Sequence, residues 1–233
     1  MFTDVAAQVK LPKLIGDSMI LQRDAKLKIW GWAAAKEKVT IHFNNKTYNT
    51  ITAQDGMWMI TLMPMHAGGP YDMQIDAGNR IIIKNILIGD VWVCSGQSNM
   101  EMPMQRLQDK YPEIIAAANN RNIRQFNVST KYNFQSAQED LASGSWQTAT
   151  PQSVLQFTAV GYFFAKTLYE KYHVPVGLIK SAVGGSPAEA WLSADALKQF
   201  PSYLHKIDTL RNQSYVDSVI QHDNANSNTW YNN

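Results

Sequence analysis

The chain has 233 residues, of which 45% are hydrophobic and 17% are charged, and its formal net charge at pH 7 is +2. This balance excludes a disordered segment and allows one large or two small domains with a sizeable core. The low charge, without a block of Lys or Arg, excludes the basic surface of a nucleic-acid-binding protein.

The sequence shows no pattern for a disulfide, a signal peptide or a membrane span. Cys94 is the single cysteine, so no intramolecular disulfide is possible, and its apolar neighbours predict a small buried side chain. The first residues lack the basic and apolar regions of a signal peptide. The longest apolar stretch, 81–94, contains polar residues and is too short for a bilayer. We therefore expect a soluble protein with no membrane partner.

Residues 1–85 have the pattern of an all-β domain. Short runs that alternate hydrophobic and polar residues recur, and clusters of Gly, Asn, Asp and Pro separate them. Short strands at this spacing favour an antiparallel β-sandwich. Asp55-Gly56 lies between two of the runs and is a hairpin-turn signal. The expected strands are 19–21, 27–30, 38–43, 48–52, 58–62, 71–75 and 80–83.

After residue 85 the pattern changes to strands alternating with helices. Buried apolar strands joined by helices favour a parallel sheet with helices on its faces, so we expect an α/β domain over residues 86–210. Residues 211–233 are polar and are predicted to form a tail or the start of a further segment. The expected strands are 86–88, 91–93, 123–128 and 176–179, and the expected helices are 112–118, 153–172 and 187–196.

The strongest helix signal is that of residues 153–172. Apolar residues recur there at the spacing of one helix face, which predicts a side packed on the sheet. The residues of this expected face are Val154, Phe157, Val160, Gly161, Phe164, Leu168 and Tyr172.

Ser98 follows an apolar strand in the run DVWVCSGQSNME, residues 90–101. A serine nucleophile needs a base that accepts its proton and donors that hold the oxyanion. A site between a strand and a helix supplies backbone N–H groups and the positive end of the helix dipole, and Gly96 permits a sharp turn. Ser98 and Glu101 also fit a capping box, and Met100 replaces the last glycine of the Gly-x-Ser-x-Gly elbow. The spacing alone leaves both functions open.

A second strand that ends in glycines strengthens the case for a site. It precedes Gly184-Gly185-Ser186-Pro187, after which a helix is expected to begin. Two adjacent parallel strands would place this loop and the Ser98 loop at the same carboxyl edge, where ligands bind in open α/β sheets. Gly184 or Gly185 could then offer an N–H group to an oxyanion, although a Gly-Gly pair also serves simply as a tight turn.

With these blocks the chain resembles the sialate O-acetylesterase family, a branch of the SGNH hydrolases, over nearly its whole length. The resemblance implies an N-terminal β-sandwich followed by an SGNH-type three-layer α/β/α domain with a parallel sheet, incomplete at its C-terminus. The blocks that carry it are Leu11-Pro12 with 17–23, 28–33, 88–92 with 96–101, and 184–187 with Glu189 and Trp191.

The resemblance implies a serine esterase that removes O-acetyl groups from a sugar through an acetyl-enzyme, without a metal ion or other cofactor. Ser98 would be the nucleophile, and the N–H groups of Ser98 and Gly185, with Gly184 beside them, would form the oxyanion hole. Gln97, Asn99 and Glu189 would shape the substrate pocket. An extracytoplasmic location, periplasmic or secreted, is also implied.

The chain departs from the family in its histidines. The family carries two later blocks, one with an Asn of the oxyanion hole and one with an Asp followed by the catalytic His. None of the histidines of this chain has an Asp three residues before it; they are His42, His66, His173, His205 and His222. His222, beside Asp223, is the one we would test as a base. We expect that the chain stops before the catalytic His and that a C-terminal fragment of the same enzyme is its partner.

Two other functions fit the residues. The acetylated sugar could be xylan or another plant glycan, because nothing in these residues selects the sugar. Alternatively the protein binds carbohydrate without catalysis, and its Trp side chains stack on sugar rings instead of packing in cores.

Overall fold

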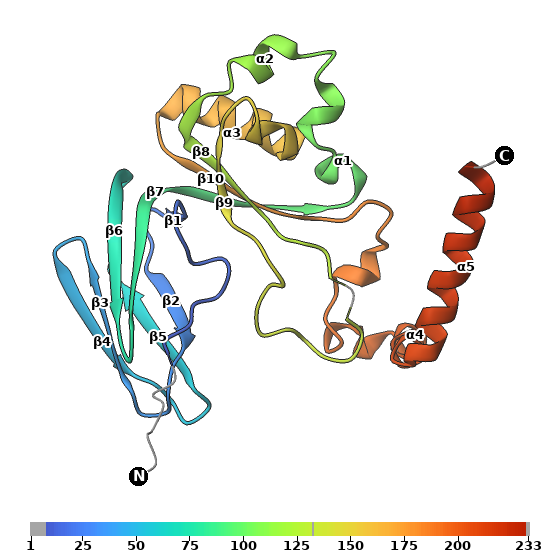
Figure 1. Cartoon of the computed structure of the whole chain (residues 1–233), viewed down its shortest axis with the longest axis horizontal. Helices are drawn as coiled ribbons and strands as arrows, with labels where there is room; N and C mark the ends of the chain where they lie inside the picture. The colour runs from blue at the N-terminus through green and yellow to red at the C-terminus, as the bar shows by residue number, and fades with distance from the viewer. Residues whose placement is uncertain (1–7, 132, 232–233) are drawn as a thin grey trace. The chain divides into compact units, whose positions relative to one another are not determined.

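The computed structural model describes residues 8–131 and 133–231, which form a mixed α/β protein (Figure 1). The chain divides into two compact units. The first comprises the residues up to Thr130 together with Asp140–Gly184, and the second comprises Lys131–Glu139 together with the residues from Gly185 on. Among the described residues, no helix is both long and apolar enough to cross a bilayer.

The N-terminal strands of the first unit cover a core with one face each. In β3 and β5 every second side chain is buried, the pattern of strands with one face toward a core. β3, β4, β6 and the start of β7 pair antiparallel, whereas β2 and β5 form a separate two-stranded sheet. Inward side chains of both sheets belong to one hydrophobic core. The strands are β1 Ile20–Gln22, β2 Leu27–Trp32, β3 Lys38–Phe43, β4 Lys46–Ile51, β5 Met57–Leu62, β6 Gly68–Asp76 and β7 Arg80–Gly96.

The hairpin predicted at Asp55-Gly56 is wrong, although a turn is present there. Gly56 has a φ of 81°, and the Met57 N–H donates to Asp55 Oδ1 at 2.9 Å. The strands before and after this turn, β4 and β5, lie in different sheets. The hairpin is instead β3–β4, which turns at Asn44 and Asn45, with φ values of 47° and 58°. Two asparagines with positive φ suit such a turn, because Asn tolerates the left-handed region.

β7 runs on beyond its antiparallel partners into a parallel arrangement. Its residues 90–96 pair with β10 (Val176–Ala182), and β10 pairs with β8 (Asn120–Asn127), both in parallel register. The parallel pairing expected of these strands is therefore found. β9 (Trp146–Ala149), which the sequence analysis did not predict, pairs antiparallel with β8. The short strand β1 pairs parallel with residues 87–89 of β7.

Helices of the first unit pack over β8 and β10 (Figure 1). A second hydrophobic core, distinct from that of the N-terminal strands, includes side chains of α3, β8 and β10 with Cys94 of β7. Cys94 is buried as expected, and this burial raises the pKa of its thiol. The helical elements of this unit are α1 Ser98–Glu101, η1 Met104–Leu107, α2 Pro112–Ala116, η2 Ser153–Gln156 and α3 Ala159–Tyr172, where η denotes a 3-10 helix.

The helix predicted over 153–172 is interrupted. Phe157 is extended and Thr158 is the N-cap of α3, with its Oγ1 accepting the Gly161 N–H at 3.5 Å. The break changes the helical register after residue 156, so the predicted face is right only in part. Val154, Phe157 and Gly161 are buried, whereas Val160, Phe164 and Tyr172 are exposed. The buried residues of α3 are Ala159, Gly161, Tyr162 and Ala165.

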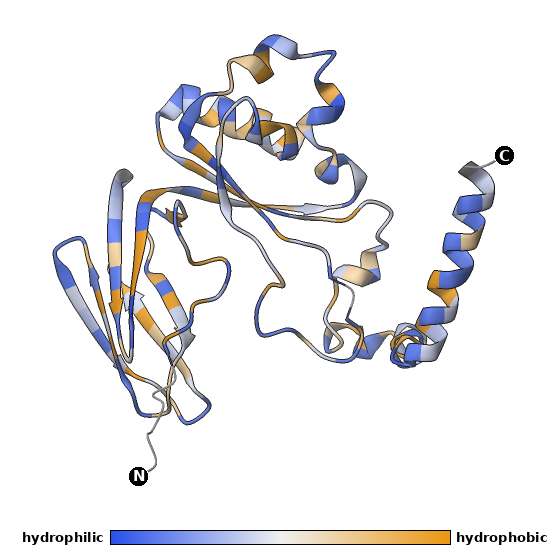
Figure 2. Cartoon of the chain, viewed as in Figure 1, coloured by the Kyte–Doolittle hydropathy of each residue, from blue (hydrophilic) through white to orange (hydrophobic). Residues whose placement is uncertain are grey.

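After Gly185 the second unit contains 3-10 turns and then two α-helices. The helix predicted over 187–196 is wrong, because the backbone forms two 3-10 turns, η3 Ala188–Trp191 and η4 Ala196–Gln199, with extended Leu192 between them. α4 (Pro201–Leu210) and α5 (Gln213–Tyr231) follow. The segment predicted as a polar tail thus contains a helix, which is largely hydrophilic (Figure 2). No Gly or Pro interrupts residues 213–231, and polarity alone does not oppose a helix.

Arg124 of β8 is a buried cation that joins three segments of the first unit. Its side chain is buried, and it donates to the carbonyl oxygens of Ser18 at 2.8 Å and Asn85 at 2.6 Å. It also donates to Asn85 Oδ1 at 3.0 Å and to the Arg121 carbonyl at 3.0 Å. Burial, with a smaller effect of Arg121, lowers the pKa of Arg124 to about 10, so it remains charged at neutral pH. Because no carboxylate pairs with it in these contacts, carbonyl dipoles hold the charge.

Replacing Arg124 tests this junction. Arg124→Met keeps much of the buried volume but leaves the carbonyl groups of Ser18 and Asn85 without their donor. We expect the free energy of unfolding, measured by urea titration, to fall by about 2 kcal/mol or more. Arg121→Met, at an exposed position three residues earlier, is the control and should change it by less than about 0.5 kcal/mol. Equal effects of the two substitutions would contradict the assigned role of Arg124.

Candidate active site

The turn that carries Ser98 begins where β7 ends. Gly96 has a φ of 129°, a conformation that side-chain-bearing residues rarely adopt, so a glycine is needed for the chain to leave the strand here. α1 follows as a single turn, Ser98–Glu101, closed by the N–H groups of Met100 and Glu101, which donate to the Gln97 carbonyl. Because α1 is a single turn, the helix dipole that the sequence predicts at Ser98 is weak.

The capping-box interpretation of Ser98 and Glu101 is wrong. The N-cap of α1 is Gln97, without a side-chain cap bond, and Ser98 is the first residue inside the helix. The Glu101 carboxylate does not return to Ser98 but accepts the N–H of Gly184 at 2.7 Å. Ser98 is therefore not used as a cap, and its side chain is exposed. Within residues 8–131 and 133–231, neither its hydroxyl nor its N–H has a hydrogen-bond partner.

Gly184 lies directly against the Ser98 turn. β7 and β10 end side by side, and the Val183 N–H donates to the Gly96 carbonyl at 3.0 Å. A Cβ atom on Gly184 would lie 2.5 Å from Glu101 Oε2 and 3.8 Å from the Ser98 Cα. The two loops predicted to share one sheet edge are thus in contact. The Gly184 N–H is already donated to Glu101.

The start of α3 contacts the same loop. The Ala159 N–H donates to the Met102 carbonyl at 2.8 Å, and the Thr158 Oγ1 lies 3.5 Å from the sulfur of Met100. Gly161 lets this turn of α3 lie close to β7, because a Cβ there would lie 2.5 Å from Thr158 Cγ2 and 3.2 Å from Cys94 Sγ. These contacts fix residues 100–102, so the position of Ser98 is set by packing around it.

The other predicted site residues are divided between the two units. Gln97 and Asn99 are exposed beside Ser98 in the first unit. Gly185 and Glu189 belong to the second unit. Gly185 has a φ of 76°, and Glu189 is half-buried in η3, where the Trp191 Nε1 donates to Ser186 Oγ at 2.9 Å. Their roles as oxyanion donor and pocket residue stay predictions.

The histidines of the first unit are engaged away from Ser98. His42 contacts Thr47 Oγ1 at 3.0 Å and Asp76 at 3.5 Å, and His173 is the left-handed C-cap of α3. His66 pairs with Asp24 at 2.7 Å. None of these contacts involves the Ser98 turn. His205 and His222 lie in α4 and α5 of the second unit, and the proposal of His222 as a base stays untested.

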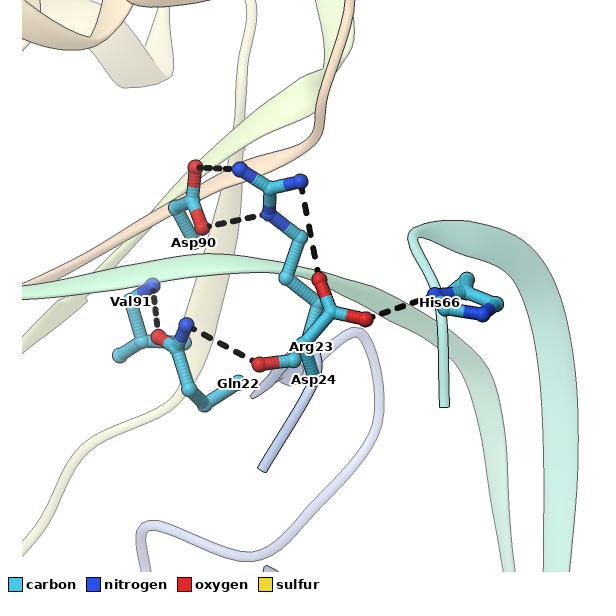
Figure 3. Close-up of polar contacts among 6 residues, drawn as sticks. All are labelled: Gln22, Arg23, Asp24, His66, Asp90 and Val91. Atoms are coloured by element: carbon cyan, nitrogen blue, oxygen red, sulfur yellow. Dashed lines mark hydrogen bonds and ion pairs between the residues drawn. The ribbon is translucent and has the colours of Figure 1, made fainter. Parts of the chain in front are cut away.

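A polar cluster that the sequence analysis missed lies where β1 ends against β7 (Figure 3). Arg23 donates to both carboxylate oxygens of Asp90, at 2.8 and 3.3 Å, and lies 3.7 Å from Asp24. Gln22 Oε1 accepts the Val91 N–H at 2.9 Å. Six residues of extended strand, about 20 Å, separate Asp90 from Gly96, so we do not assign the Asp24–His66 pair to Ser98. Gln22, Arg23 and Asp90 all lie in the sequence blocks that carry the resemblance. Their place in those blocks is the signal from which the cluster could have been predicted.

A shallow polar pocket of about 610 Å³ lies on the β3–β4 hairpin, apart from the Ser98 turn. It is lined by residues 42–47 and 70–72, including Tyr71. Among the described residues, no three or more His, Cys, Asp or Glu side chains are grouped so as to hold a metal ion.

A family model described as "Carbohydrate esterase, sialic acid-specific acetylesterase" matches residues 88–227, which include the Ser98 turn and Gly184. The chain belongs to this family. It is 32% identical over 203 residues to the sialate O-acetylesterase of Pongo abelii, in a match that covers 79% of this chain and 39% of the relative. The human sialate O-acetylesterase is 32% identical over 205 residues, with the same two coverages.

A solved structure, that of a novel carbohydrate acetylesterase from Xanthomonas citri, resembles this chain with a TM-score of 0.78 and 38% sequence identity. The match covers 82% of this chain and 43% of that one. The chain thus spans about two fifths of the length of the relatives that it matches.

The contact between Glu101 and Gly184 predicts a measurable protection of one amide. In Glu101→Ala we expect the Gly184 amide hydrogen to exchange about tenfold faster by NMR, because a bond of about 1.4 kcal/mol is lost. Glu101→Gln should have a smaller effect, because the amide oxygen can still accept. Glu113→Ala, at an exposed site of α2, is the control. Unchanged exchange in Glu101→Ala would show that the carboxylate does not hold this loop.

Proposed function

We propose that the protein is the nucleophile-bearing part of a carbohydrate O-acetylesterase and that Ser98 is the nucleophile. The observation that carries the proposal is the Ser98 turn itself. In a chain of this family, an exposed serine with an unbonded hydroxyl and N–H follows the parallel segment of β7. It lies beside the glycine loop that ends the neighbouring strand, β10.

In the proposed reaction Ser98 Oγ attacks the carbonyl carbon of the acetyl ester while a base takes the hydroxyl proton. The tetrahedral intermediate collapses, the sugar oxygen leaves with that proton, and acetyl-Ser98 remains. Water then repeats the attack and releases acetate. The Ser98 N–H is a donor for the oxyanion. Because Glu101 already accepts the Gly184 N–H, we assign the second donor to Gly185 and the role of anchor to Gly184.

The base and the remaining oxyanion donor are proposed to come from a C-terminal part of the enzyme. This agrees with the fraction of the relatives that the chain covers and with the contacts of His42, His66 and His173 elsewhere. The N-terminal strands are proposed to be the β-sandwich of the family, and β7, β8 and β10 part of its SGNH-type three-layer domain. An extracytoplasmic location is part of the same proposal.

The substrate is proposed to be an O-acetylated sugar, with sialic acid as the first choice because the matched relatives are named sialate O-acetylesterases. Acetylated xylan is the alternative. Hydrolysis rates on O-acetylsialic acid and on acetylxylan, measured side by side with a longer form of the protein, decide between them.

A second candidate function, carbohydrate binding without catalysis, is favoured by the pocket on the β3–β4 hairpin. Its polar side chains and the Tyr71 ring suit a sugar, whereas Trp58 and Trp146 are buried in the core. Titration of the chain with acetylated oligosaccharides, compared with Tyr71→Ala and Ser98→Ala, tests it. Binding that depends on Tyr71 and not on Ser98 would support this function.

Ser98→Ala tests the nucleophile. In a form of the protein that includes the C-terminal part, kcat for p-nitrophenyl acetate should fall at least about 10³-fold, because no acetyl-enzyme can form. Ser95→Ala, at an exposed serine three residues earlier, is the matched control and should keep most of the activity. Retention of activity in Ser98→Ala would exclude Ser98.

The 233-residue chain by itself should be nearly inactive. Loss of a catalytic base costs several powers of ten in rate, so we expect turnover at least about 10³-fold below that of the longer form. Purified chain and longer form are compared at equal concentrations, with His222→Ala as a further variant. Activity of the chain that reaches the longer form and disappears in His222→Ala would make His222 the base and contradict the need for another part.

A further inference from the structure

Gln125 is a buried polar residue of β8 that the proposed reaction does not explain. It is 2% exposed, and its strand neighbours Ile123 and Phe126 belong to the hydrophobic cores. A buried amide needs partners for both its oxygen and its nitrogen, because an unsatisfied group costs free energy. Both partners of Gln125 lie in the segment that leads into α3. The Thr158 N–H donates to Gln125 Oε1 at 2.9 Å, and Gln125 Nε2 donates to the Gln156 carbonyl at 3.3 Å.

These two bonds fix the break between η2 and α3. The amide oxygen must face an N–H group and the amide nitrogen must face a carbonyl group, so the side chain of Gln125 fits the segment in one orientation. Phe157 at the break is extended and buried, and the fully buried Thr158 is the N-cap of α3. The conformation that separates the two helices therefore depends on a side chain from the sheet.

The same segment binds the chain that follows Ser98. The Phe157 carbonyl accepts the Met104 N–H at 2.9 Å, and the Ala159 N–H donates to the Met102 carbonyl at 2.8 Å. The two bonds flank an isolated antiparallel bridge, so the two stretches of chain form a short antiparallel pair. A shift of the segment before α3 would therefore move the residues that end α1.

Two contacts relate this antiparallel pair to Ser98. The Met102 N–H donates to the Ser98 carbonyl at 3.0 Å and so closes the turn of α1. The sulfur of Met100, inside the same turn, lies 3.5 Å from Thr158 Oγ1. The contacts from Gln125 through Thr158 to the Ser98 turn are thus continuous, and all of them lie within the first unit.

We propose that Gln125 is a positioning residue for Ser98, which it holds in place through the segment 156–158. The inference rests on the proposed role of Ser98 as the nucleophile. An apolar side chain of similar size would fill the same space, but it would not select one conformation of this segment. Because a nucleophile reacts only from a narrow range of positions, a small displacement of the Ser98 turn lowers the rate of the chemical step.

The first experiment uses NMR on the 233-residue chain and does not depend on esterase activity. Gln125→Met keeps the length of the side chain and loses both hydrogen bonds. We expect the Thr158 amide hydrogen to exchange about tenfold faster or more, because its acceptor is gone. The Met104 and Ala159 amides should also exchange faster, and the Ser98 amide resonance should shift, because the disturbance passes along the antiparallel pair.

Gln147→Met is the matched control. Gln147 of β9 pairs with Gln125 in the sheet, but its side chain is exposed. The control substitution should leave the Thr158 and Ser98 amides unchanged. An unshifted Ser98 resonance in Gln125→Met would overturn the inference, because the effect of Gln125 would then end before the Ser98 turn. Unchanged exchange of the Thr158 amide would overturn it as well.

The second experiment measures kinetics in a form of the protein that includes the C-terminal part, well below its unfolding temperature. For p-nitrophenyl acetate, kcat of Gln125→Met should fall about tenfold or more, whereas KM should change less than about twofold, because binding of the small ester does not depend on the exact position of Ser98. Ile41→Val removes a buried methyl group from the other hydrophobic core. It controls for a general loss of stability and should keep the wild-type kcat.

Gln125→Glu tests for rescue by a side chain of the same shape. A buried carboxyl group stays neutral, because burial raises its pKa, and it can then accept from Thr158 and donate to Gln156. At about pH 6 this variant should keep most of the wild-type kcat measured at the same pH. Gln125→Asn, whose amide is one methylene too short for both bonds, replaces Gln125→Met in both experiments if the latter does not fold.

The outcomes separate the inference from the proposed function. Wild-type kcat in Gln125→Met, or in the Asn variant that replaces it, would overturn the inference, as would an equal fall of kcat in Ile41→Val. A Gln125→Glu variant as slow as Gln125→Met would also overturn it, because the hydrogen bonds would then not be the cause. Activity retained in Ser98→Ala would instead refute the proposed function, and the NMR comparison would still show whether Gln125 sets the position of the Ser98 turn.

Discussion

The rest of the structure depends on one long strand, β7, which pairs with different neighbouring strands in its two halves. β7 pairs antiparallel with β6 in its first half and parallel with β10 in its second half, and Ser98 follows two residues after its end. Bonds that hold β7 in register therefore also position the Ser98 turn. Arg23 and Gln22 provide such bonds at the changeover, through Asp90 and Val91 (Figure 3).

Two sets of polar contacts fix the loops around β7, whose positions apolar packing alone would not define. Arg124 ties β8 to the turns at Ser18 and Asn85, both of which have positive φ values. Glu101 ties the end of β10 to the Ser98 turn through the Gly184 N–H. Unlike hydrophobic contacts, hydrogen bonds to carbonyl and N–H groups demand a defined geometry, so they specify where the loops lie.

Much of this arrangement could be predicted from the sequence. The alternation of strands, the parallel pairing of β7, β8 and β10, and the meeting of the Ser98 and Gly184 loops follow from local pattern and the rules of parallel sheets. The break before α3 could not be predicted, because Phe157 and Thr158 take their conformation from bonds to Met104 and Gln125, distant in sequence. The hydrogen bond from Gly184 to Glu101 could not be predicted either, because the capping-box pattern considers only residues within one turn.

The central claim is that Ser98 carries the acetyl group. The most direct measurement is rapid acid quenching of a longer form of the protein during hydrolysis of an acetyl ester, followed by peptide mass spectrometry. The account predicts acetylation of the peptide that contains residues 90–101, located at Ser98 and absent from Ser98→Ala. Acetyl on another residue, or turnover in Ser98→Ala at the wild-type rate, would contradict it.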